Sequence, residues 1–179
     1  FMTSANFAVH ANAIIPVSGP ENVLKSHSIV VRQGLIDALM PHAQARALSD
    51  IDHVELPDHV LMPGLVNAHG HAGMTLLRGY ADDMSLASWL NDKIWPLEAR
   101  WVSPEFVRDG TDIAAAEMLL SGITTTSDMY FFPDIAAQSL RAAGMRTQLV
   151  FPVMNIETAW AKNAEEYFEK GLALRDYFR

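Results

Sequence analysis

The regular alternation of short apolar runs with amphipathic stretches after Pro63 limits most strongly what this chain can fold into. Strand-like runs are expected at residues 60–67, 123–129 and 146–154, with helical stretches between and after them. This order is typical of βαβ units, because right-handed crossovers make the strands parallel and place the helices outside. Strand carboxyl ends then meet at one edge, so functional residues are expected directly after each strand.

Helix signals support the same α/β interpretation. Ser103 is expected to be an N-cap with Pro104 at the first helical position, and Gly122 supplies the end of that helix. Within this helix, apolar residues recur every seven positions, at Phe106, Ile113 and Leu120. Further helices are expected around residues 86–94 and over 134–143 and 163–178. Residues 63–179 are therefore predicted to form three consecutive βα units.

The first part of the chain, residues 1–62, predicts a different architecture. The Gln33-Gly34 pair predicts a hairpin turn, and no long apolar element lies in this region. Short strands are expected at residues 7–15, 28–32, 35–39 and 53–56. A few short strands are marginally stable alone, so we expect them to be part of a small sheet that other segments complete.

Composition excludes several classes of function. The chain has 13 Lys and Arg against 21 Asp and Glu, a formal charge of −8, which argues against nucleic acid and anionic membrane surfaces as partners. It has no cysteine, so a metal site must use nitrogen and oxygen ligands. The sequence shows no signal peptide and no apolar run of about 18 residues, which predicts a cytoplasmic protein.

The leading chemical signal is the histidine pair in Asn67-Ala68-His69-Gly70-His71, directly after the first strand of the alternating region. Side chains two residues apart on an extended segment point to the same side, so His69 and His71 can present two imidazole nitrogens to one metal ion. Their place at a strand end favours metal ligation, and the alternative is a non-ligating pair in a loop. The other histidines are expected to be solvated or in loops: His10, His27, His42, His53 and His59.

A catalytic zinc site normally uses three protein ligands and a water, so two histidines need further ligands. Asp128, near the end of the second strand, is the only carboxylate in a comparable position. We interpret Asp128 as a hydrogen-bond acceptor behind the site, and direct ligation is the alternative.

Longer motifs give a family resemblance. The run from Pro63 to Gly79, PGLVNAHGHAGMTLLRG, resembles the amidohydrolase superfamily. Its MTLLRG part, together with Trp89, Glu98 and DMYF at residues 128–131, resembles the branch of 5-methylthioadenosine/S-adenosylhomocysteine deaminases and their chlorohydrolase-like relatives. The resemblance runs over essentially the whole chain, whereas the PGLVNxHxH element alone marks only the superfamily.

The resemblance implies roles for individual residues. His69 and His71 would bind a divalent metal, usually zinc, with iron or manganese as alternatives. Glu98 would accept hydrogen bonds from the ribose hydroxyls, since two carboxylate oxygens suit two vicinal donors. Without the resemblance, Glu98 would be interpreted as a solvated helix residue. Trp89 would line the nucleoside pocket, and the alternative is a tryptophan of the core.

Two further expectations concern the surroundings of the site. Arg78 and the Asp82-Asp83 pair are expected to form structural ion pairs near its mouth. Family members that accept S-adenosylhomocysteine have an arginine at the end of the third strand, where this sequence aligns Phe151. An apolar ring suits a methylthio group better than a carboxylate, which predicts a preference for methylthioadenosine or adenosine.

The resemblance also implies the fold. Residues 63–179 would be the N-terminal portion of a (β/α)8 TIM barrel, namely its first three βα units, and residues 1–62 strands of a small composite β-sandwich domain. A complete barrel takes about 250 residues, so the C-terminal portion of the same polypeptide is expected to be missing. The whole protein is expected to be a homo-oligomer.

The implied reaction is hydrolytic deamination of an adenosine-type nucleoside, in which a metal-activated hydroxide attacks C6 and ammonia leaves. No catalytic general base is assigned within this chain, because the resemblance places it on a later strand. The isolated chain is therefore expected to be inactive. Alternatives for the parent protein are a chlorohydrolase, a guanine-deaminase-like enzyme or a cyclic amidase of the same superfamily.

Overall fold

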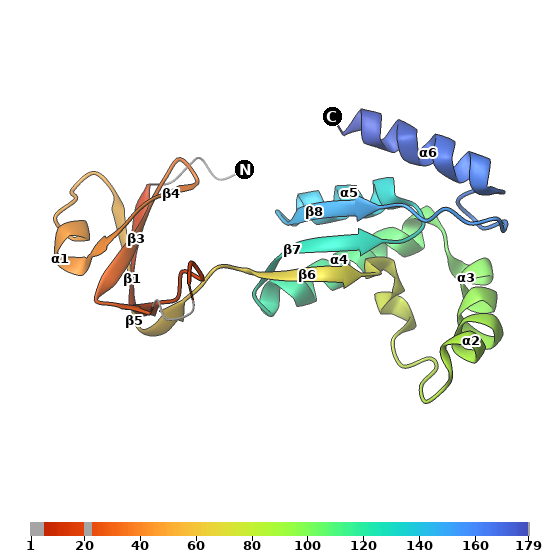
Figure 1. Cartoon of the computed structure of the whole chain (residues 1–179), viewed down its shortest axis with the longest axis horizontal. Helices are drawn as coiled ribbons and strands as arrows, with labels where there is room; N and C mark the ends of the chain where they lie inside the picture. The colour runs from red at the N-terminus through yellow and green to blue at the C-terminus, as the bar shows by residue number, and fades with distance from the viewer. Residues whose placement is uncertain (1–5, 20–22, 179) are drawn as a thin grey trace. The chain divides into compact units, whose positions relative to one another are not determined.

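The computed structural model describes residues 6–19 and 23–178. The chain divides into two compact units, Phe1–Pro63 and Gly64–Arg179. In Figure 1 the first unit is a twisted sheet with one short helix, and the second is a smaller sheet with helices packed against it. This is a mixed α/β architecture, with the strand-rich part first and the alternating part second, as the sequence predicts.

The first unit is a five-stranded sheet in which β2, β1, β3 and β4 are neighbours and β5 pairs with β1. The hairpin between β3 and β4 turns at Gln33, with φ 52°, and Gly34, with φ 78°. Two successive positive φ angles match the twist of the strands, which confirms the expected turn. The bounds are β1 Phe7–Ile14, β2 Leu24–Lys25, β3 His27–Arg32, β4 Leu35–Pro41, the short helix α1 His42–Ala45 and β5 Asp52–Leu61.

Two prolines explain where the strands differ from those expected. β5 continues through Pro57, because its register against β1 shifts between Ala11 and Ala13 and leaves the proline in an irregular stretch. By contrast, Pro63 lies between β5 and the next strand, β6 Leu65–Gly70. The expectation of one continuous strand over residues 60–67 is therefore wrong, since this proline separates two strands that belong to different units.

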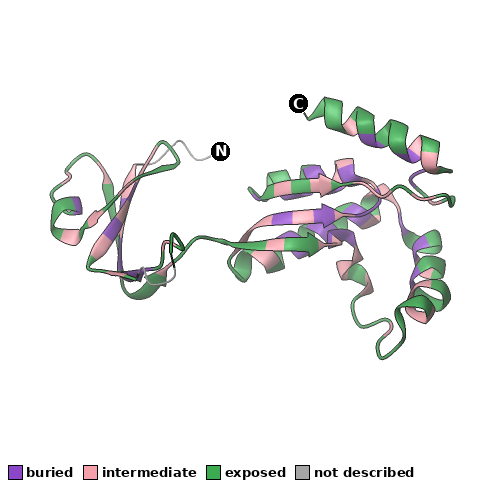
Figure 2. Ribbon diagram, in the orientation of Figure 1, coloured by how far each residue is buried: buried purple, intermediate pink, exposed green. Residues whose placement is uncertain are grey.

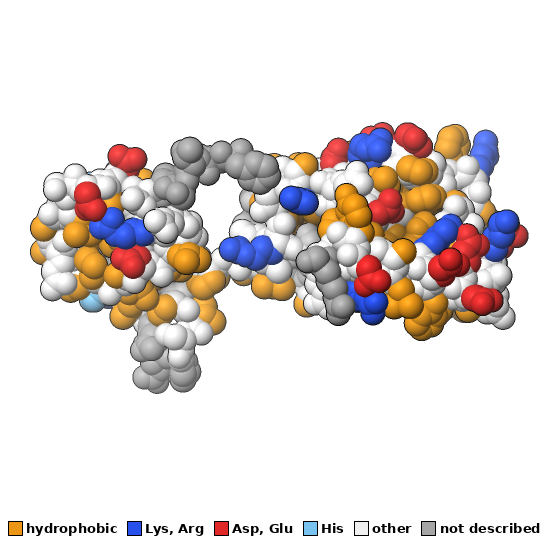
Figure 3. Space-filling view, turned by 90° about the horizontal axis from the view of Figure 1, so that it is seen from above, with side chains coloured by type: hydrophobic (Ala, Val, Ile, Leu, Met, Phe, Trp, Pro, Cys, Tyr) orange, Lys and Arg blue, Asp and Glu red, His pale blue; other side chains and the backbone are white. Residues whose placement is uncertain are grey.

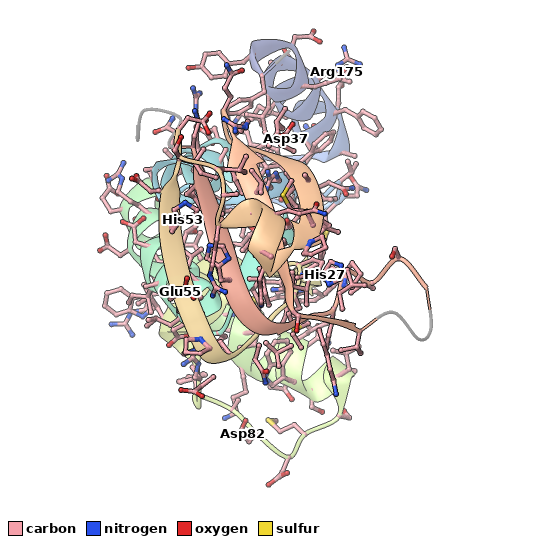
Figure 4. All side chains as sticks on the ribbon, turned by 90° about the vertical axis from the view of Figure 1, so that its left-hand side faces the viewer. His27, Asp37, His53, Glu55, Asp82 and Arg175 are labelled. Atoms are coloured by element: carbon pink, nitrogen blue, oxygen red, sulfur yellow. The ribbon has the colours of Figure 1, made fainter. Side chains whose placement is uncertain are left out.

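His10 on β1 corrects another expectation. Only 1% of its surface is exposed, so the prediction of a solvated or loop histidine is wrong for this residue. Its Nδ1 lies 2.6 Å from Ser28 Oγ, and its Nε2 lies 2.9 Å from His53 Nδ1. β1 lies between β3 and β5, so Ser28 of β3 and His53 of β5 flank the His10 ring. Figure 4 shows His53 and Glu55 along β5.

In the second unit, three parallel strands lie in the order β6, β7 and β8. Two helices, α4 and α5, pack on one face of this sheet, where Ala115, Leu140 and Met145 form a small core (Figure 1). β8 ends at Val150, four residues before the predicted strand end at residue 154. The bounds are β7 Ile123–Met129, β8 Arg146–Val150, α4 Pro104–Leu120, α5 Pro133–Ala142 and α6 Ala164–Tyr177.

A helical connection follows β6. A 3-10 helix, η1, begins one residue after His71, and a later helical segment leads to α4. Four short pieces make up this connection: η1 Ala72–Leu77, α2 Leu86–Ser88, the π-helical turn η2 Trp89–Ile94 and α3 Trp95–Trp101. The sequence predicts the helical character around residues 86–94, and in the structure it extends to Trp101.

Helix α4 begins as predicted but buries a different face. Ser103 is the N-cap, and its Oγ accepts a hydrogen bond from the Phe106 amide at 3.2 Å. However, the expected apolar stripe is largely outside the core, since Ile113 is 44% and Leu120 is 89% exposed. The buried face is built mainly of small residues, which let α4 approach η1 closely: Val107, Gly110, Thr111, Ala114 and Ala115.

The main hydrophobic core of the second unit lies around the carboxyl ends of the strands. Tyr130 and Phe131 directly follow β7, and they pack with Val107 of α4 and Tyr167 of α6. Figure 2 shows buried residues on β7 and on the helix faces, whereas β6 is mostly exposed. The residues that follow β7 are therefore packed in a hydrophobic core.

The molecular surface carries mixed charges. On the face shown in Figure 3, the basic groups among the described residues are interspersed with acidic and apolar ones. Within residues 6–19 and 23–178, no helix is long and apolar enough to cross a membrane.

Candidate metal and nucleoside site

The two histidines of the predicted motif come together at the end of β6. His69 lies on the strand and His71 directly follows it, and their Nε2 atoms are 3.2 Å apart with ring planes at 89°. If each nitrogen binds one ion at about 2.0–2.1 Å, this separation corresponds to an angle of about 100° at the ion, near the tetrahedral value. The pair therefore fits one zinc-like metal.

A backbone carbonyl orients the second histidine. His71 Nδ1 lies 2.6 Å from the carbonyl oxygen of Met129, at the end of β7. A carbonyl only accepts, so Nδ1 carries the proton, and in the neutral ring Nε2 keeps its lone pair for a metal. Such a partner is usual behind a metal-binding imidazole. The sequence offers no signal for this contact, because a carbonyl is present at every residue.

Asp128 holds the backbone next to the histidine pair. Its side chain is 2% exposed, and Oδ1 accepts a hydrogen bond from the Ala72 amide at 2.6 Å. Burial raises the pKa of Asp128, while this hydrogen bond and the nearby His71 act to lower it. The contact supports the interpretation of Asp128 as an acceptor behind the site.

Glu98 is buried in α3, and only 8% of its surface is exposed. The interpretation from the residues alone, a solvated helix glutamate, is therefore wrong. The hydroxyl of Tyr130 donates a hydrogen bond to Glu98 Oε1 at 2.8 Å. Burial raises the pKa of Glu98, while the bond from Tyr130 and the electrostatic influence of His71 lower it. Glu98 thus lies within electrostatic range of His71.

A cavity of about 90 Å³ opens beside Glu98. Trp89 is not among the residues that line it, and its Nε1 donates to the carbonyl of Ala81 at 3.1 Å in a half-buried setting. The role of Trp89 in a nucleoside pocket therefore stays a prediction. Most of the lining is apolar, and it includes Trp95, Val102, Phe131, Met154 and Ile156.

Arg78 has a different ion-pair partner from the one expected. Its guanidinium pairs with Glu117 of α4 at 2.5 Å rather than with Asp82 or Asp83. Asp82 lies in the loop between η1 and α2 (Figure 4). Glu117 holds the pKa of Arg78 above its usual value through this bond, and the pair links the residue after η1 to α4. The predicted ion pair exists, but with a carboxylate 39 residues away in the sequence.

Phe151 directly follows β8, at the end of the third strand of this unit. Its ring lies against α6, where a Cβ added at Gly171 would come within 2.2 Å of the Phe151 ring. It forms further ring contacts with Trp160 and Phe168, and it does not line the cavity beside Glu98. In the described residues, Phe151 thus packs between the end of β8 and α6, and the substrate preference inferred from it stays a prediction.

The histidine pair is incomplete as a catalytic metal site. Over the part of the chain that the structure describes, no group of three or more histidine or carboxylate side chains is arranged to hold a metal ion. The two imidazoles supply two nitrogen ligands, and a catalytic zinc site usually takes three protein ligands.

Comparison with known proteins gives consistent matches. The model of the amidohydrolase family matches residues 60–179. A 5-methylthioadenosine/S-adenosylhomocysteine deaminase of Teredinibacter turnerae is 47% identical over 178 residues, which cover 99% of this chain and 40% of that protein. A 5′-deoxyadenosine deaminase of Methanosarcina barkeri is 42% identical over 139 residues, covering 77% of this chain and 31% of that protein.

A solved structure matches as well. The crystal structure of an adenosine deaminase from Xanthomonas campestris with bound zinc superimposes with a TM-score of 0.94 and 42% sequence identity. The match covers 98% of this chain and 40% of that one, so this chain spans about two fifths of its length. The α/β fold described above therefore matches one portion of that longer chain.

Proposed function

Because the chain belongs to the amidohydrolase family, we propose that the full-length protein containing it is a metal-dependent hydrolytic deaminase of adenosine-type nucleosides. The observation that carries the proposal is the His69–His71 pair, with two Nε2 atoms 3.2 Å apart at a strand end. The deaminase names of the relatives support the reaction. Their substrates make 5′-methylthioadenosine, 5′-deoxyadenosine and S-adenosylhomocysteine the compounds to test, with adenosine.

His69 and His71 would hold the metal, which we propose to be zinc because the similar adenosine deaminase was crystallised with zinc. When bound, such a metal supplies a Lewis acid and lowers the pKa of a water molecule toward neutrality. His71 would contribute the lone pair of its Nε2, because the Met129 carbonyl accepts from its Nδ1 and orients the ring. Asp128 accepts from the Ala72 amide and so holds the backbone that follows His71.

Glu98 would bind the ribose. Its carboxylate can accept hydrogen bonds from two vicinal hydroxyls, and its burial removes the competing water. A charge-assisted hydrogen bond in such a setting is stronger than one between neutral groups. We propose that the proton transfers to the adenine ring and to the leaving ammonia use residues of the full-length protein beyond this chain.

Four further assignments accompany this proposal. The units described above would belong to a complete TIM barrel and to a small β-sandwich domain of the full-length protein. Cytoplasmic location and homo-oligomeric assembly stay predictions from the sequence.

The test is ammonia release by the full-length protein from the four nucleosides, together with its zinc content. We expect His69→Ala and His71→Ala each to lower activity at least about 100-fold and to reduce bound zinc. His59→Ala is the matched control, because His59 is exposed and belongs to the other unit. Activity only on triazines or guanine would contradict the nucleoside assignment. Two metals per subunit with cyclic amide hydrolysis would contradict the reaction.

A further inference from the structure

Glu98 is held by a residue from another part of the unit. The Tyr130 hydroxyl donates to Glu98 Oε1 at 2.8 Å, and Tyr130 is 5% exposed. Tyr130 directly follows β7, whereas Glu98 lies in α3, 32 residues earlier in the sequence. The hydrogen bond therefore joins the helix that carries Glu98 to the end of a central strand.

The Tyr130 ring has little freedom to move. A Cβ added at Gly73 would lie 2.7 Å from Tyr130 Cδ1, so the absence of a side chain at Gly73 makes the space for the ring. The Phe131 ring lies beside it at a centroid distance of 5.2 Å, and Val107 belongs to the same core. A ring packed in this way holds its hydroxyl in one place, and that hydroxyl can therefore fix the carboxylate to which it donates.

The protonation states of Tyr130 and Glu98 allow Tyr130 to fix this carboxylate. Burial and the negative charge of Glu98 raise the pKa of the Tyr130 hydroxyl well above its usual value, so it stays a donor at neutral pH. The same hydrogen bond lowers the pKa of Glu98 and so opposes the effect of its burial. Tyr130 therefore favours the ionised form of Glu98, which is the form that accepts two hydrogen bonds.

Two successive residues at the end of β7 fix the two halves of the site. The Met129 carbonyl accepts from His71, and the next residue, Tyr130, donates to Glu98. We propose that Tyr130 is a positioning residue that sets the Glu98 carboxylate relative to the His69–His71 pair, so that a bound ribose presents its base to the metal. This inference rests on the proposed function of Glu98 as the ribose acceptor.

The experiment compares the full-length wild-type protein with Tyr130→Phe on adenosine and on 2′,3′-dideoxyadenosine, which lacks both ribose hydroxyls. The change removes one oxygen and keeps the ring. We expect kcat/KM for adenosine to fall roughly tenfold, with little change for the dideoxynucleoside and with unchanged zinc content. In a Glu98→Ala background, Tyr130→Phe should have no further effect on the ratio of the two values.

Tyr167→Phe is the matched control, because it removes a buried hydroxyl bonded to Thr158 in the same core and does not contact Glu98. It should leave the ratio of the two kcat/KM values unchanged. The inference is overturned if Tyr130→Phe lowers both values equally, reduces zinc, or changes the ratio no more than Tyr167→Phe. If Glu98→Ala itself leaves the ratio of the two kcat/KM values at the wild-type value, the proposed contact between Glu98 and the ribose is wrong, independently of the result for Tyr130→Phe.

Discussion

A hydrogen-bonded chain of polar side chains crosses the first unit at His10. His53 Nε2 donates to the Leu48 carbonyl at 2.9 Å, so in the neutral ring its Nδ1 accepts from His10 Nε2. His10 Nδ1 then accepts from the hydroxyl of Ser28, which in turn lies 2.8 Å from His42 Nδ1. This arrangement satisfies His10 as a neutral ring with one donor and one acceptor.

We predict that the first unit loses stability as the pH falls below about 6.5, the usual histidine value. Burial lowers the pKa of His10, aided by Arg46, His53 and His42, and Glu55 opposes the shift. The unfolded chain therefore binds the proton more readily, and the stability from neutral His10 is present at higher pH and lost on acidification.

Hydrogen-exchange protection of the β1 amides, corrected for the intrinsic pH dependence of exchange, measures this effect in the full-length protein. His10→Phe keeps a ring and should show a smaller decline in protection between pH 7.5 and about 5.5. His59→Phe, at an exposed position on β5, should decline like the wild type. Equal pH dependence in wild type and His10→Phe would show that His10 is not the group responsible.

Single residues also show what the sequence can and cannot predict about the site. The His69–His71 pair is visible from its spacing, because the two-residue period of an extended segment needs no tertiary information. The groups that hold His71 and Glu98 in place cannot be predicted in this way. Met129 lies 58 residues from His71, and Tyr130 lies 32 residues from Glu98, so only the folded chain brings these groups together.

At the scale of the elements, helix α4 and η1 pack backbone to backbone. A Cβ added at Gly110 would lie 2.4 Å from the Gly73 carbonyl oxygen, so the helix cannot keep its place with any larger residue there. Gly73 also makes the space for Tyr130. This contact explains why the buried face of α4 is composed mainly of small residues rather than of the apolar stripe.

We predict that Gly110→Ala lowers the free energy of unfolding by about 1–3 kcal/mol, although alanine is the better helix former by roughly 0.5–1 kcal/mol. Urea unfolding of the full-length protein, followed by the fluorescence of its tryptophans, measures the change. Asp112→Ala, at an exposed position of the same helix, should stay within about 0.5 kcal/mol of the wild type. A Gly110→Ala protein as stable as the wild type would show that η1 can move away without cost.

Elements with strong local signals are the ones the sequence predicts best. β7 spans Ile123–Met129 as expected, because it is bounded by Gly122 and by the turn before Pro133. The division between β5 and β6 is missed because apolar residues continue across Pro63. Which face of α4 is buried depends on its partner η1, and heptad spacing alone does not contain that information.

At the scale of the whole molecule, the second unit presents a sheet with apolar side chains at its outer strand. On β6, Leu65 is 48% and Val66 is 63% exposed, and β6 and β8 are the outer strands of the sheet (Figure 2). The matched structures are longer, and this chain covers 40% of the similar adenosine deaminase. Further strands of the full-length protein would cover such surfaces, since exposed strand edges and apolar faces are liabilities in isolation.

The metal site leads to a prediction at the same scale. Residues 1–179 expressed alone should release no ammonia from adenosine or 5′-methylthioadenosine, whereas the full-length protein should. The described residues offer the metal two imidazoles and no third ligand group, so zinc should bind the isolated chain at least about 100-fold more weakly than it binds the full-length protein.

Calorimetric zinc titration and an ammonia assay on both proteins, with circular dichroism to verify that each is folded, provide the measurement. Within the isolated chain, His69→Ala should abolish the residual zinc binding, because one imidazole cannot replace the pair, and His59→Ala should leave it unchanged. Deamination by folded residues 1–179, or zinc binding as tight as that of the full-length protein, would show that this chain completes the site by itself. Residual binding that requires His69 would instead identify the pair as the first half of a site completed elsewhere in the protein.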